Sequence, residues 1–502
     1  MKKHGNLKSS TFSENEPAHQ HRTRFITAAS LFDGHDAAIN IMRRILQSSG
    51  AEVIHLGHNR SVHTILKSAL EEDAQAIAIS SYQGGHVEFF KYIVDLLKKQ
   101  GLAHIKVFGG GGGTITPDEI SELEKYGVKK IYSPEDGRKL GLQGIIDHML
   151  EQSNEHPLAH IEWDHLKTFN SNSKALAQAL TCIELGESGF DHSPFESKKS
   201  YLDSLRTIIK SQSKGATVVG LTGPGGAGKS SLTDELVLRV LEHDSKARVA
   251  VLAIDPSRRK TGGALLGDRL RMNSVSNERT FMRSFATRQA HASVSRATEE
   301  AISLLKAAGF DWVFVETGGI GQADTSIVDM VDVNLYVMTA EFGAPTQLEK
   351  INMLDYASMV IINKFEKSGS LDALNEVRKQ FRRNHREFEK LDPELYPIFG
   401  TIASRFSDAG VNSAFAHLLK LRQSDSKRIP LEKPLSIVDP RTFSIVPKDR
   451  TQYLSEIAKS VRQYHTTATE QSERVKKIEG YSSLIGDPAL NANVKTEIEK
   501  AL

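Results

Sequence analysis

Short apolar segments alternate with amphipathic segments twice along the chain. In the first part, the apolar segments that we expect to form strands are 25–32, 52–56, 76–80, 105–108 and 130–132. Stretches with helical periodicity separate them, namely 37–47, 62–70 and 87–99. This alternation is typical of a parallel sheet covered by helices. The pattern therefore predicts a small doubly wound α/β domain over residues 25–150.

A second series of strands and helices begins near residue 216. Its expected strands lie at 216–221, 248–254, 312–316, 333–338, 359–363 and 396–399. We predict a second doubly wound parallel-sheet domain over residues 206–425, joined to the first by a helical connector over 151–205. The remaining parts are a polar leader at 1–24 and a charged helical linker at 426–502, which begins with several prolines.

Composition narrows the classes of protein that fit. The chain has 502 residues, 39% of them hydrophobic and 25% charged, as in ordinary globular proteins of two or three domains. A net charge of +2 predicts no general affinity for nucleic acid. The single cysteine, Cys182, excludes an intrachain disulfide. We find no apolar run long enough for a membrane span and no secretory signal in the leader, so we expect a cytoplasmic protein.

Residues 223–230 form a complete phosphate loop with the pattern G-x-x-x-x-G-K-S. An apolar strand precedes the loop and a helical pattern follows it, which is the context that the motif requires. The backbone of such a loop faces a polyphosphate, the lysine reaches the terminal phosphates and the serine ligates Mg²⁺. The predicted nucleotide-binding residues here are Gly223, Gly225, Gly226, Ala227, Gly228, Lys229 and Ser230.

Two acidic residues follow expected strands of the same domain. Asp255 follows 248–254 and Glu316 ends 312–316, so both carboxylates should lie at the edge of the sheet that carries the loop. Either could hold Mg²⁺ directly or through water. We predict Lys229, Asp255 and Glu316 as the catalytic residues.

The four residues 363–366 follow the strand 359–363 and read Asn-Lys-Phe-Glu. They resemble the Asn-Lys-x-Asp guanine-binding motif of GTPases, with Glu366 in place of the usual aspartate. A carboxylate there accepts hydrogen bonds from two guanine N–H groups that adenine lacks. We therefore expect Asn363, Lys364, Phe365 and Glu366 to favour GTP over ATP.

Three longer segments, 253–257, 261–272 and 316–322, resemble the MeaB-type GTPases, which are chaperones of cobalamin-dependent acyl-CoA mutases. The resemblance implies a P-loop GTPase domain in which Arg271 contacts the nucleotide. It also implies a Mg²⁺ site at Ser230, Ile254 (through its carbonyl), Asp255, Asp268, Glu316 and Thr317.

Three loops of the first domain carry unusual residues at the carboxyl ends of expected strands. They read Asp-Gly-His-Asp-Ala-Ala at 33–38, Ser-Ser-Tyr-Gln-Gly-Gly-His at 80–86 and Phe-Gly-Gly-Gly-Gly-Gly-Thr at 108–114. Together they resemble the flavodoxin-like cobalamin-binding domain of the mutases, except that Ala38 stands where the family has glycine. A response-regulator receiver domain has a similar fold, but it would need an acidic pocket and a lysine where this chain has the glycine run.

This second resemblance implies adenosylcobalamin as the cofactor. The Nε2 atom of His35 would coordinate cobalt, and Asp33 would accept a hydrogen bond from the other ring nitrogen and fix the tautomer. Residues Ser80, Tyr82, Gly109, Gly110 and Gly111 would line a slot for the displaced nucleotide tail of the cofactor.

The order of the two domains resembles the first half of the fused acyl-CoA mutases of the isobutyryl-CoA type. We expect a homodimeric GTPase that loads or protects adenosylcobalamin in an acyl-CoA mutase, whose substrate-binding barrel is a separate domain or subunit. The chain alone should then not isomerise acyl-CoA. Two alternatives stay open: a non-catalytic cobalamin carrier or sensor with GTP as a conformational ligand, and a metal-ion chaperone, for which the His-Gln-His at 19–21 is a sparse metal tract.

Overall fold

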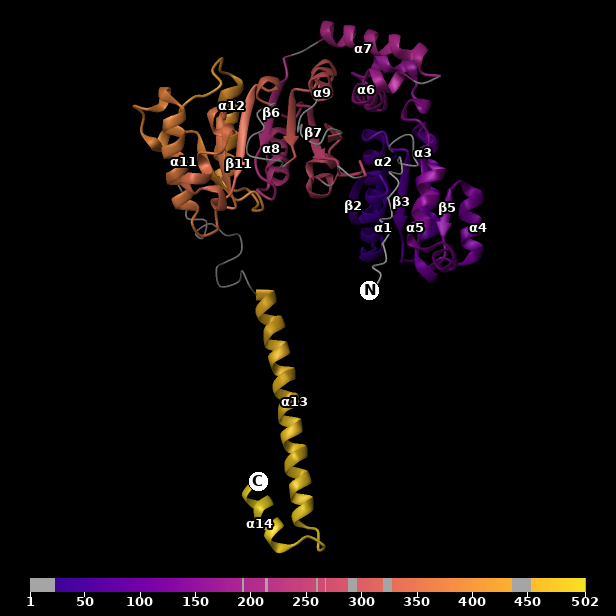
Figure 1. The fold of residues 1–502 in the computed structure, drawn as a ribbon, viewed down its shortest axis with the longest axis vertical. Coiled ribbons are helices and arrows are strands. Elements are labelled where there is room, and N and C mark those ends of the chain that lie inside the picture. The colour runs from indigo at the N-terminus through magenta and orange to yellow at the C-terminus, as the bar shows by residue number, and fades with distance from the viewer. Residues whose placement is uncertain are drawn as a thin grey trace, which may run out of the picture. The chain divides into compact units, whose positions relative to one another are not determined.

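The structure is a computed structural model that describes residues 23–191, 194–212, 215–258, 261–266, 268–287, 296–318, 327–435 and 453–501. The chain divides into a large unit that ends at residue 437 and a small unit that follows it. The large unit contains two parallel sheets with helices on both faces (Figure 1). This confirms the predicted fold class of two doubly wound α/β domains.

The first sheet has the strand order β5-β4-β3-β1-β2-β8, with every pair parallel. Its order reverses between β1 and β3, which is the point where such sheets bind ligands. Pairing of Ala29 with Ser80 brings the carboxyl ends of these two strands together. The elements of this part are β1 (Arg24–Ser30), α1 (Ala37–Ser48), β2 (Glu52–Arg60), α2 (Val62–Glu71), β3 (Ala76–Ser80), α3 (His86–Lys99), β4 (Lys106–Gly110), α4 (Pro117–Tyr126), β5 (Lys130–Tyr132) and α5 (Pro134–Gln152).

Local sequence signals fix several helix starts in this part. Thr116 and Ser133 each form a capping box with an acidic residue three positions later, and a proline follows each of them. Ser61 caps α2 by accepting a hydrogen bond from the Thr64 N–H. Apolar cores then form on both faces of the sheet, from α2, α3 and α4 on one face and from α1 and α5 on the other.

The second sheet has the strand order β13-β12-β11-β6-β10-β7-β9, also with every pair parallel. One apolar core contains α6, α7, α9 and α11, and the other contains α8 and α12. The elements are α6 (Ser173–Leu185), α7 (Lys199–Gln212), β6 (Thr217–Thr222), α8 (Lys229–His243), β7 (Val249–Pro256), β8 (Ala264–Leu266), β9 (Thr280–Thr287), α9 (Arg296–Ala307), β10 (Trp312–Thr317), β11 (Val333–Met338), α10 (Pro345–Leu348), β12 (Met359–Asn363), α11 (Ser370–Asn384), β13 (Ile398–Thr401) and α12 (Ala409–Arg422).

The strand β8 belongs to the second series in sequence but to the first sheet in space. Its three residues pair in parallel with Glu52, Val53 and Ile54 of β2. We had not expected this strand, nor β9, because neither segment forms a long apolar run. The predicted strands at 76–80, 130–132, 333–338 and 359–363 are confirmed with their bounds, and the other predicted strands are displaced by a few residues.

The division into five segments stays a prediction. Two observations bear on where its boundaries should be drawn. Helix α6, from the predicted connector, packs in the same apolar core as the strands of the second sheet. Thr23 and Arg24, from the predicted leader, are buried, and Arg24 begins β1; residues 1–22 lie outside the described residues.

The small unit contains two helices, α13 (Tyr453–Ile485) and α14 (Ala492–Ala501). The side chains of α13 are almost all exposed, including Leu454, Val461 and Tyr464. Among the described helices of both units, none is long and apolar enough to cross a membrane.

Candidate functional site

The predicted phosphate loop connects β6 to α8, which begins at Lys229. Its shape requires glycine at two positions. Gly223 has a φ of 146°, and a Cβ there would lie 1.9 Å from the carbonyl oxygen of Val337 on the neighbouring strand. Gly228 is left-handed with a φ of 90°, and a Cβ there would lie 2.4 Å from Nδ2 of Asn363. The loop therefore passes close to two strands where only glycine fits.

The side chain of Lys229 lies over the loop. It is 7% exposed, and its Nζ atom donates to the carbonyl oxygens of Gly223 at 3.0 Å and Pro224 at 3.3 Å. Both of these acceptors are neutral carbonyl oxygens of the loop itself. Gly225 and Gly226 are exposed and Ala227 is buried, so the outer turn of the loop is open to a ligand.

The predicted Mg²⁺ ligands other than Asp268 lie at the carboxyl ends of the paired strands β7 and β10 and in the first turn of α8. Ser230 donates from Oγ to Oε1 of Glu316 at 2.8 Å, and both residues are buried. Thr317 pairs with Ile254 across β10 and β7, and Asp255 follows Ile254 on β7 and is half-buried. A hydroxyl, carboxylates and a backbone carbonyl are the hard oxygen ligands that Mg²⁺ prefers. The residues present therefore fit this cation.

Thr233 belongs to the same cluster, although the sequence analysis did not select it. It lies three residues after Ser230, on the same face of α8, and its Oγ1 donates to Oε2 of Glu316 at 3.2 Å. Both oxygens of that carboxylate are thus held by hydroxyl groups of one helix. The helical spacing of the two residues was the signal that could have identified Thr233.

The predicted base-binding residues lie at the end of β12, beside the phosphate loop. Asn363 is buried and donates from Nδ2 to the carbonyl of Ala227 at 2.9 Å, and its Oδ1 accepts from Thr401 and from the Ala403 N–H. Lys364 donates from Nζ to the carbonyl of Gly226 at 2.7 Å. Asn363 and Lys364 thus connect the base-binding segment to the phosphate loop.

The other two residues of the motif differ in exposure. The ring of Phe365 is buried against Gly400, where a Cβ would lie 2.6 Å from the ring. Glu366 is exposed. The structure thus holds the first three residues in place and leaves the carboxylate at the surface, where an incoming base could meet it.

Two residues predicted from the resemblance lie in the segment that connects the two sheets. The 3-10 helix η6 (Asp268–Arg271) follows β8 and contacts β2 and α8. Arg271 in it is exposed, whereas its neighbour Arg269 is buried. The roles of Asp268 and Arg271 at the nucleotide site stay predictions. Residues 319–326, which hold most of the third resembling segment, lie outside the described residues.

The second candidate site lies at the reversal point of the first sheet. The Asp33 side chain is fully buried and accepts from Nδ1 of His35 at 2.8 Å, from the His35 N–H at 2.9 Å and from the Tyr82 N–H at 2.6 Å. Burial alone would raise the pKa of Asp33, but the donors from Tyr82 and His35 outweigh it and hold this pKa below its ordinary value. Asp33 is therefore a carboxylate, and Nδ1 of His35 must be the donor.

The His35 ring itself is open to ligands. Its side chain is 68% exposed, and its centroid lies 5.7 Å from that of Tyr82. In the neutral ring, the hydrogen bond from Nδ1 to Asp33 leaves the lone pair on Nε2, the atom that can coordinate a metal. The structure thus brings together the two residues that the sequence suggested as a cobalt-binding pair.

An apolar cavity of about 340 Å³ extends beside this pair. All five residues predicted for the nucleotide tail line it: Ser80, Tyr82, Gly109, Gly110 and Gly111. A Cβ on Gly111 would lie 1.9 Å from the carbonyl oxygen of Ser81, so the glycine run packs tightly against the neighbouring loop. The Oγ of Ser80 is buried and has no hydrogen-bond partner among the described residues. An unpaired hydroxyl in an apolar slot fits a bulky ligand with a polar group.

Residues from α1 and α5 complete the wall of this cavity, and the sequence analysis did not select them. They include Ile39, Met42, Ile145 and Met149. Their apolar character is what any helix facing a sheet shows, so no local signal distinguished them from ordinary core residues. Ala38, the departure from the family pattern, also lines the cavity and leaves it open.

Two family models match this chain. The description "Methylmalonyl Co-A mutase-associated GTPase MeaB" matches residues 176–422, and "B12 binding domain" matches residues 23–134. Each match contains one of the two candidate sites. The first match begins within α6, and so includes most of the helix that packs in the core of the second sheet.

Among curated proteins, the chain is 50% identical over 467 residues to the fused isobutyryl-CoA mutase of Geobacillus kaustophilus, which covers 92% of this chain and 42% of that protein. It is 50% identical over 462 residues to the fused isobutyryl-CoA mutase of Cupriavidus metallidurans, covering 91% and 41%. A protein of Pyrococcus horikoshii named as a GTPase is 34% identical over 234 residues, covering 45% of this chain and 68% of that protein. The chain thus spans less than half the length of the two fused mutases.

Proposed function

Because this chain belongs to the MeaB family of mutase-associated GTPases and carries a B12-binding domain, we propose that it hydrolyses GTP to load or protect adenosylcobalamin in an acyl-CoA mutase. The observation that carries the proposal is the presence, in one unit, of a phosphate loop and of the Asp33–His35 pair beside an apolar slot. The family names of the fused relatives support isobutyryl-CoA as the class of substrate for the mutase.

At the nucleotide site, the backbone of Gly223–Gly228 holds the phosphates and Lys229 places its charge beside them. Mg²⁺, when bound, neutralises charge on the β- and γ-phosphates. The residues that would hold it are Ser230, Asp255, Glu316 and Thr317, with the carbonyl of Ile254 and with Asp268. Asn363–Glu366 bind the guanine, and Arg271 contacts the nucleotide. We expect the segment 260–272 to change conformation with the γ-phosphate. The second expected switch segment, 318–324, lies outside the described residues except for Gly318.

At the cofactor site, His35 binds through Nε2 while Asp33 holds the proton on Nδ1. Adenosylcobalamin, when bound, supplies a cobalt–carbon bond that breaks homolytically. Ser80, Tyr82 and the glycines 109–111 hold the nucleotide tail in the apolar slot and exclude water from it. The hydrogen bond to Asp33 fixes the tautomer and the orientation of the ring and so presents Nε2 of His35 as the ligand atom.

The proposed partners are an acyl-CoA-binding mutase barrel, as a domain or a subunit, and a second copy of this chain. Helix α13 supports the homodimer. Its exposed apolar residues Leu454, Ile457, Val461 and Tyr464 repeat at intervals of three and four, the spacing of a coiled-coil seam. Val475 and Ile478 continue the same heptad register after an interval of eleven residues. In a parallel pair of α13 helices, Arg474 of one copy would face Glu479 of the other. The two residues carry opposite charges and lie beside the apolar seam. A sedimentation measurement tests this: Val461→Glu should shift a dimer towards monomer, and a monomeric wild-type chain would contradict it.

The test of the proposed function combines spectroscopy and turnover. Titration with adenosylcobalamin should give the absorbance spectrum of a cofactor whose own base is replaced by histidine, and His35→Ala should abolish that spectrum. The isolated chain with Mg²⁺ should turn over GTP faster than ATP. Binding of the cofactor without GTP turnover would favour the carrier or sensor instead, and absence of both would reject the proposal.

A further inference from the structure

The segment from β8 to the 3-10 helix η7 (Ser274–Ser276) joins the two halves of the large unit. On one side, β8 extends the first sheet by pairing with β2. On the other side, Ser274 N–H and Asn273 Nδ2 donate to the carboxylate of Asp234 on α8, at 2.7 Å and 3.3 Å. Met272 and Val275 pack in the apolar core that contains α8. Because α8 begins at Lys229 and Ser230, the segment contacts the helix of the phosphate loop directly.

Arg269 links this segment to the first domain through two buried ion pairs. Its side chain is 2% exposed and donates from Nη1 to Glu71 at 2.8 Å and from Nη2 to Glu72 at 3.2 Å. Burial would lower the pKa of Arg269, but the two carboxylates of Glu71 and Glu72 outweigh it and raise this pKa. Arg269 therefore stays charged, and its position depends on two residues at the end of α2.

A network of mostly buried charges surrounds these ion pairs, with Lys67 at its partly exposed edge. Lys67 on α2 donates to the carbonyl oxygens of Val275, Asn277 and Thr280, each at 2.8 Å, and also pairs with Glu71. Glu72 accepts from the Ser284 N–H and Oγ on β9. Each cation thus has an acidic partner, since Arg24, Lys67, Arg269 and Arg283 pair with Glu52, Glu71, Glu72 and Glu184. A network in which every charge has an opposite partner is satisfied in only a narrow range of geometries. It therefore fixes how the first domain and the segment from β8 to β9 contact each other.

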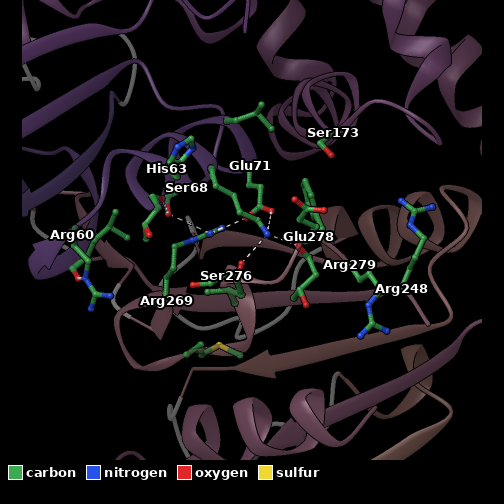
Figure 2. A pocket seen from close by; sticks show the side chains of 18 of the residues that line it. Arg60, His63, Ser68, Glu71, Ser173, Arg248, Arg269, Ser276, Glu278 and Arg279 are labelled. Carbon is green, nitrogen blue, oxygen red and sulfur yellow. Dashed lines mark hydrogen bonds and ion pairs between the residues drawn. The ribbon is translucent and has the colours of Figure 1, made fainter. Parts of the chain in front are cut away.

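The network lies beside a cavity of about 500 Å³ (Figure 2). The figure shows Arg269 joined by dashed lines to Ser68 and Glu71, while Arg279 lies on the other side of the cavity. The guanidinium of Arg279 donates to the carbonyls of Leu241, Asp244 and Ala247, all within the second domain. These two arginines therefore line the same cavity, but Arg269 alone of this pair connects the two domains.

From this geometry we infer that Arg269 is a positioning residue that couples the nucleotide site to the cobalamin-binding domain. Its ion pairs with Glu71 and Glu72 hold the segment from β8 to η7 against the first domain, while the same segment contacts helix α8 of the phosphate loop. A change in that segment with the γ-phosphate then alters the affinity of the first domain for the cofactor, and cofactor binding changes the affinity for GTP relative to GDP by the same factor. The inference rests on the proposed function and names how its two sites are regulated together.

The experiment uses the full chain with Mg²⁺ and measures the affinity for adenosylcobalamin twice, once with a non-hydrolysable GTP analogue and once with GDP. The ratio of the two affinities should lie between about 5 and 150 in the wild type. Arg269→Gln should reduce the ratio to within about twofold of one, and Arg269→Lys should restore part of it. The matched control Arg279→Gln should keep the wild-type ratio. The affinity of every variant for GDP should stay within about twofold of the wild-type value. A variant that had lost its structure would bind GDP much more weakly.

Each outcome decides the matter. Should Arg269→Gln fail to fold, Glu71→Gln tests the same contact, because it keeps the size of the side chain and a hydrogen-bond acceptor. A wild-type ratio of one, or an unchanged ratio in Arg269→Gln and Glu71→Gln, overturns the inference. Absence of GTP turnover or of the histidine-bound cofactor spectrum in the wild type would instead reject the proposed function, so the two failures are distinguishable.

Discussion

The two candidate sites lie at equivalent edges of two parallel sheets, yet they treat their polar groups in opposite ways. At the phosphate loop, polar side chains contact other protein groups: Lys229 holds two carbonyls, Asn363 holds a third and Ser230 holds Glu316. At the first sheet, Ser80 is buried without a partner among the described residues and the His35 ring is open. Hydrogen bonds among its own polar groups hold most of the first site in place, whereas the second site combines the Asp33–His35 pair with an apolar slot.

This difference follows from the chemistry of the proposed ligands. Phosphates and Mg²⁺ are small and highly charged, so their site needs many polar groups, which contact one another without the ligand. A cobalamin tail is bulky, so its site needs space, which the glycine run and the absence of side chains there provide. At the phosphate loop we therefore expect the loss of a charged group to have the main effect. At the cofactor site we expect the main effects from added side-chain volume and from loss of the proton on Nδ1 of His35.

The largest effect should come from Lys229→Ala at the phosphate loop. Loss of one preorganised positive group beside the reacting phosphates should lower the kcat for GTP by about 10²–10³-fold. Adenosylcobalamin binding without nucleotide should stay unchanged. The control is Lys367→Ala, which removes an exposed lysine paired with Glu341. Similar GTP turnover in both variants would contradict the role of Lys229.

A second test asks whether the two domains respond alike to acid. Burial lowers the pKa of His55 on β2 and of His417 on α12 to about 4. The unfolded chain therefore binds more protons than the folded chain between pH 6.5 and 4, and stability falls as the pH falls through this range. Each histidine should contribute a loss of about 3 kcal/mol by pH 4.

Chemical unfolding of His55→Gln and His417→Gln measures these contributions. Each variant should lose stability less steeply than the wild type between pH 6.5 and 4, and by similar amounts. Near pH 8 and above, the difference in the free energy of unfolding between each variant and the wild type should be independent of pH. A dependence that is as steep in both variants as in the wild type would show that neither histidine is responsible.

Space at the first sheet is tested by a pair of glycines in one loop. In Gly111→Ala the new Cβ meets the carbonyl oxygen of Ser81 at 1.9 Å, so the backbone has to move. We expect a loss of roughly 1–3 kcal/mol in the free energy of unfolding, with weaker cofactor binding. Gly113→Ala is the control, because no atom lies within 4 Å of its Cβ. Equal effects of the two substitutions would mean that close packing of the loop is unimportant.

The smallest effect concerns the single proton on His35. Asp33→Asn removes the negative charge that holds Nδ1 protonated, and cofactor affinity should fall by about 10–100-fold. GTP turnover should stay unchanged. Asp36→Asn provides the control, because Asp36 lies at the start of α1 without a side-chain capping bond. The measurement is a spectroscopic titration with adenosylcobalamin, and equal affinities in both variants would leave Asp33 without a role.

Much of the fold and of both sites could be predicted from the sequence because the signals are local. The apolar runs gave most strands, and the phosphate loop, the Asn363 motif and the glycine run lie where strands end. The site residues that could not be predicted are those whose contacts lie far away in the chain. Thr233 and the cavity residues of α1 and α5 look like ordinary helix residues until the fold brings them to a site.

The sequence by itself determined two parallel-sheet domains and the candidate residues of a nucleotide site and a cofactor site, because these depend on short-range periodicity and on motifs of fixed spacing. The tertiary structure alone decided how the domains connect. Strand β8 pairs with β2 over only three residues, although Ala264 follows its partner Glu52 by 212 positions in the chain. Arg269 pairs with Glu71 and Glu72, which precede it by 198 and 197 positions. So short a pairing and buried ion pairs between distant residues leave no local pattern, since they are stable only where two folded surfaces meet.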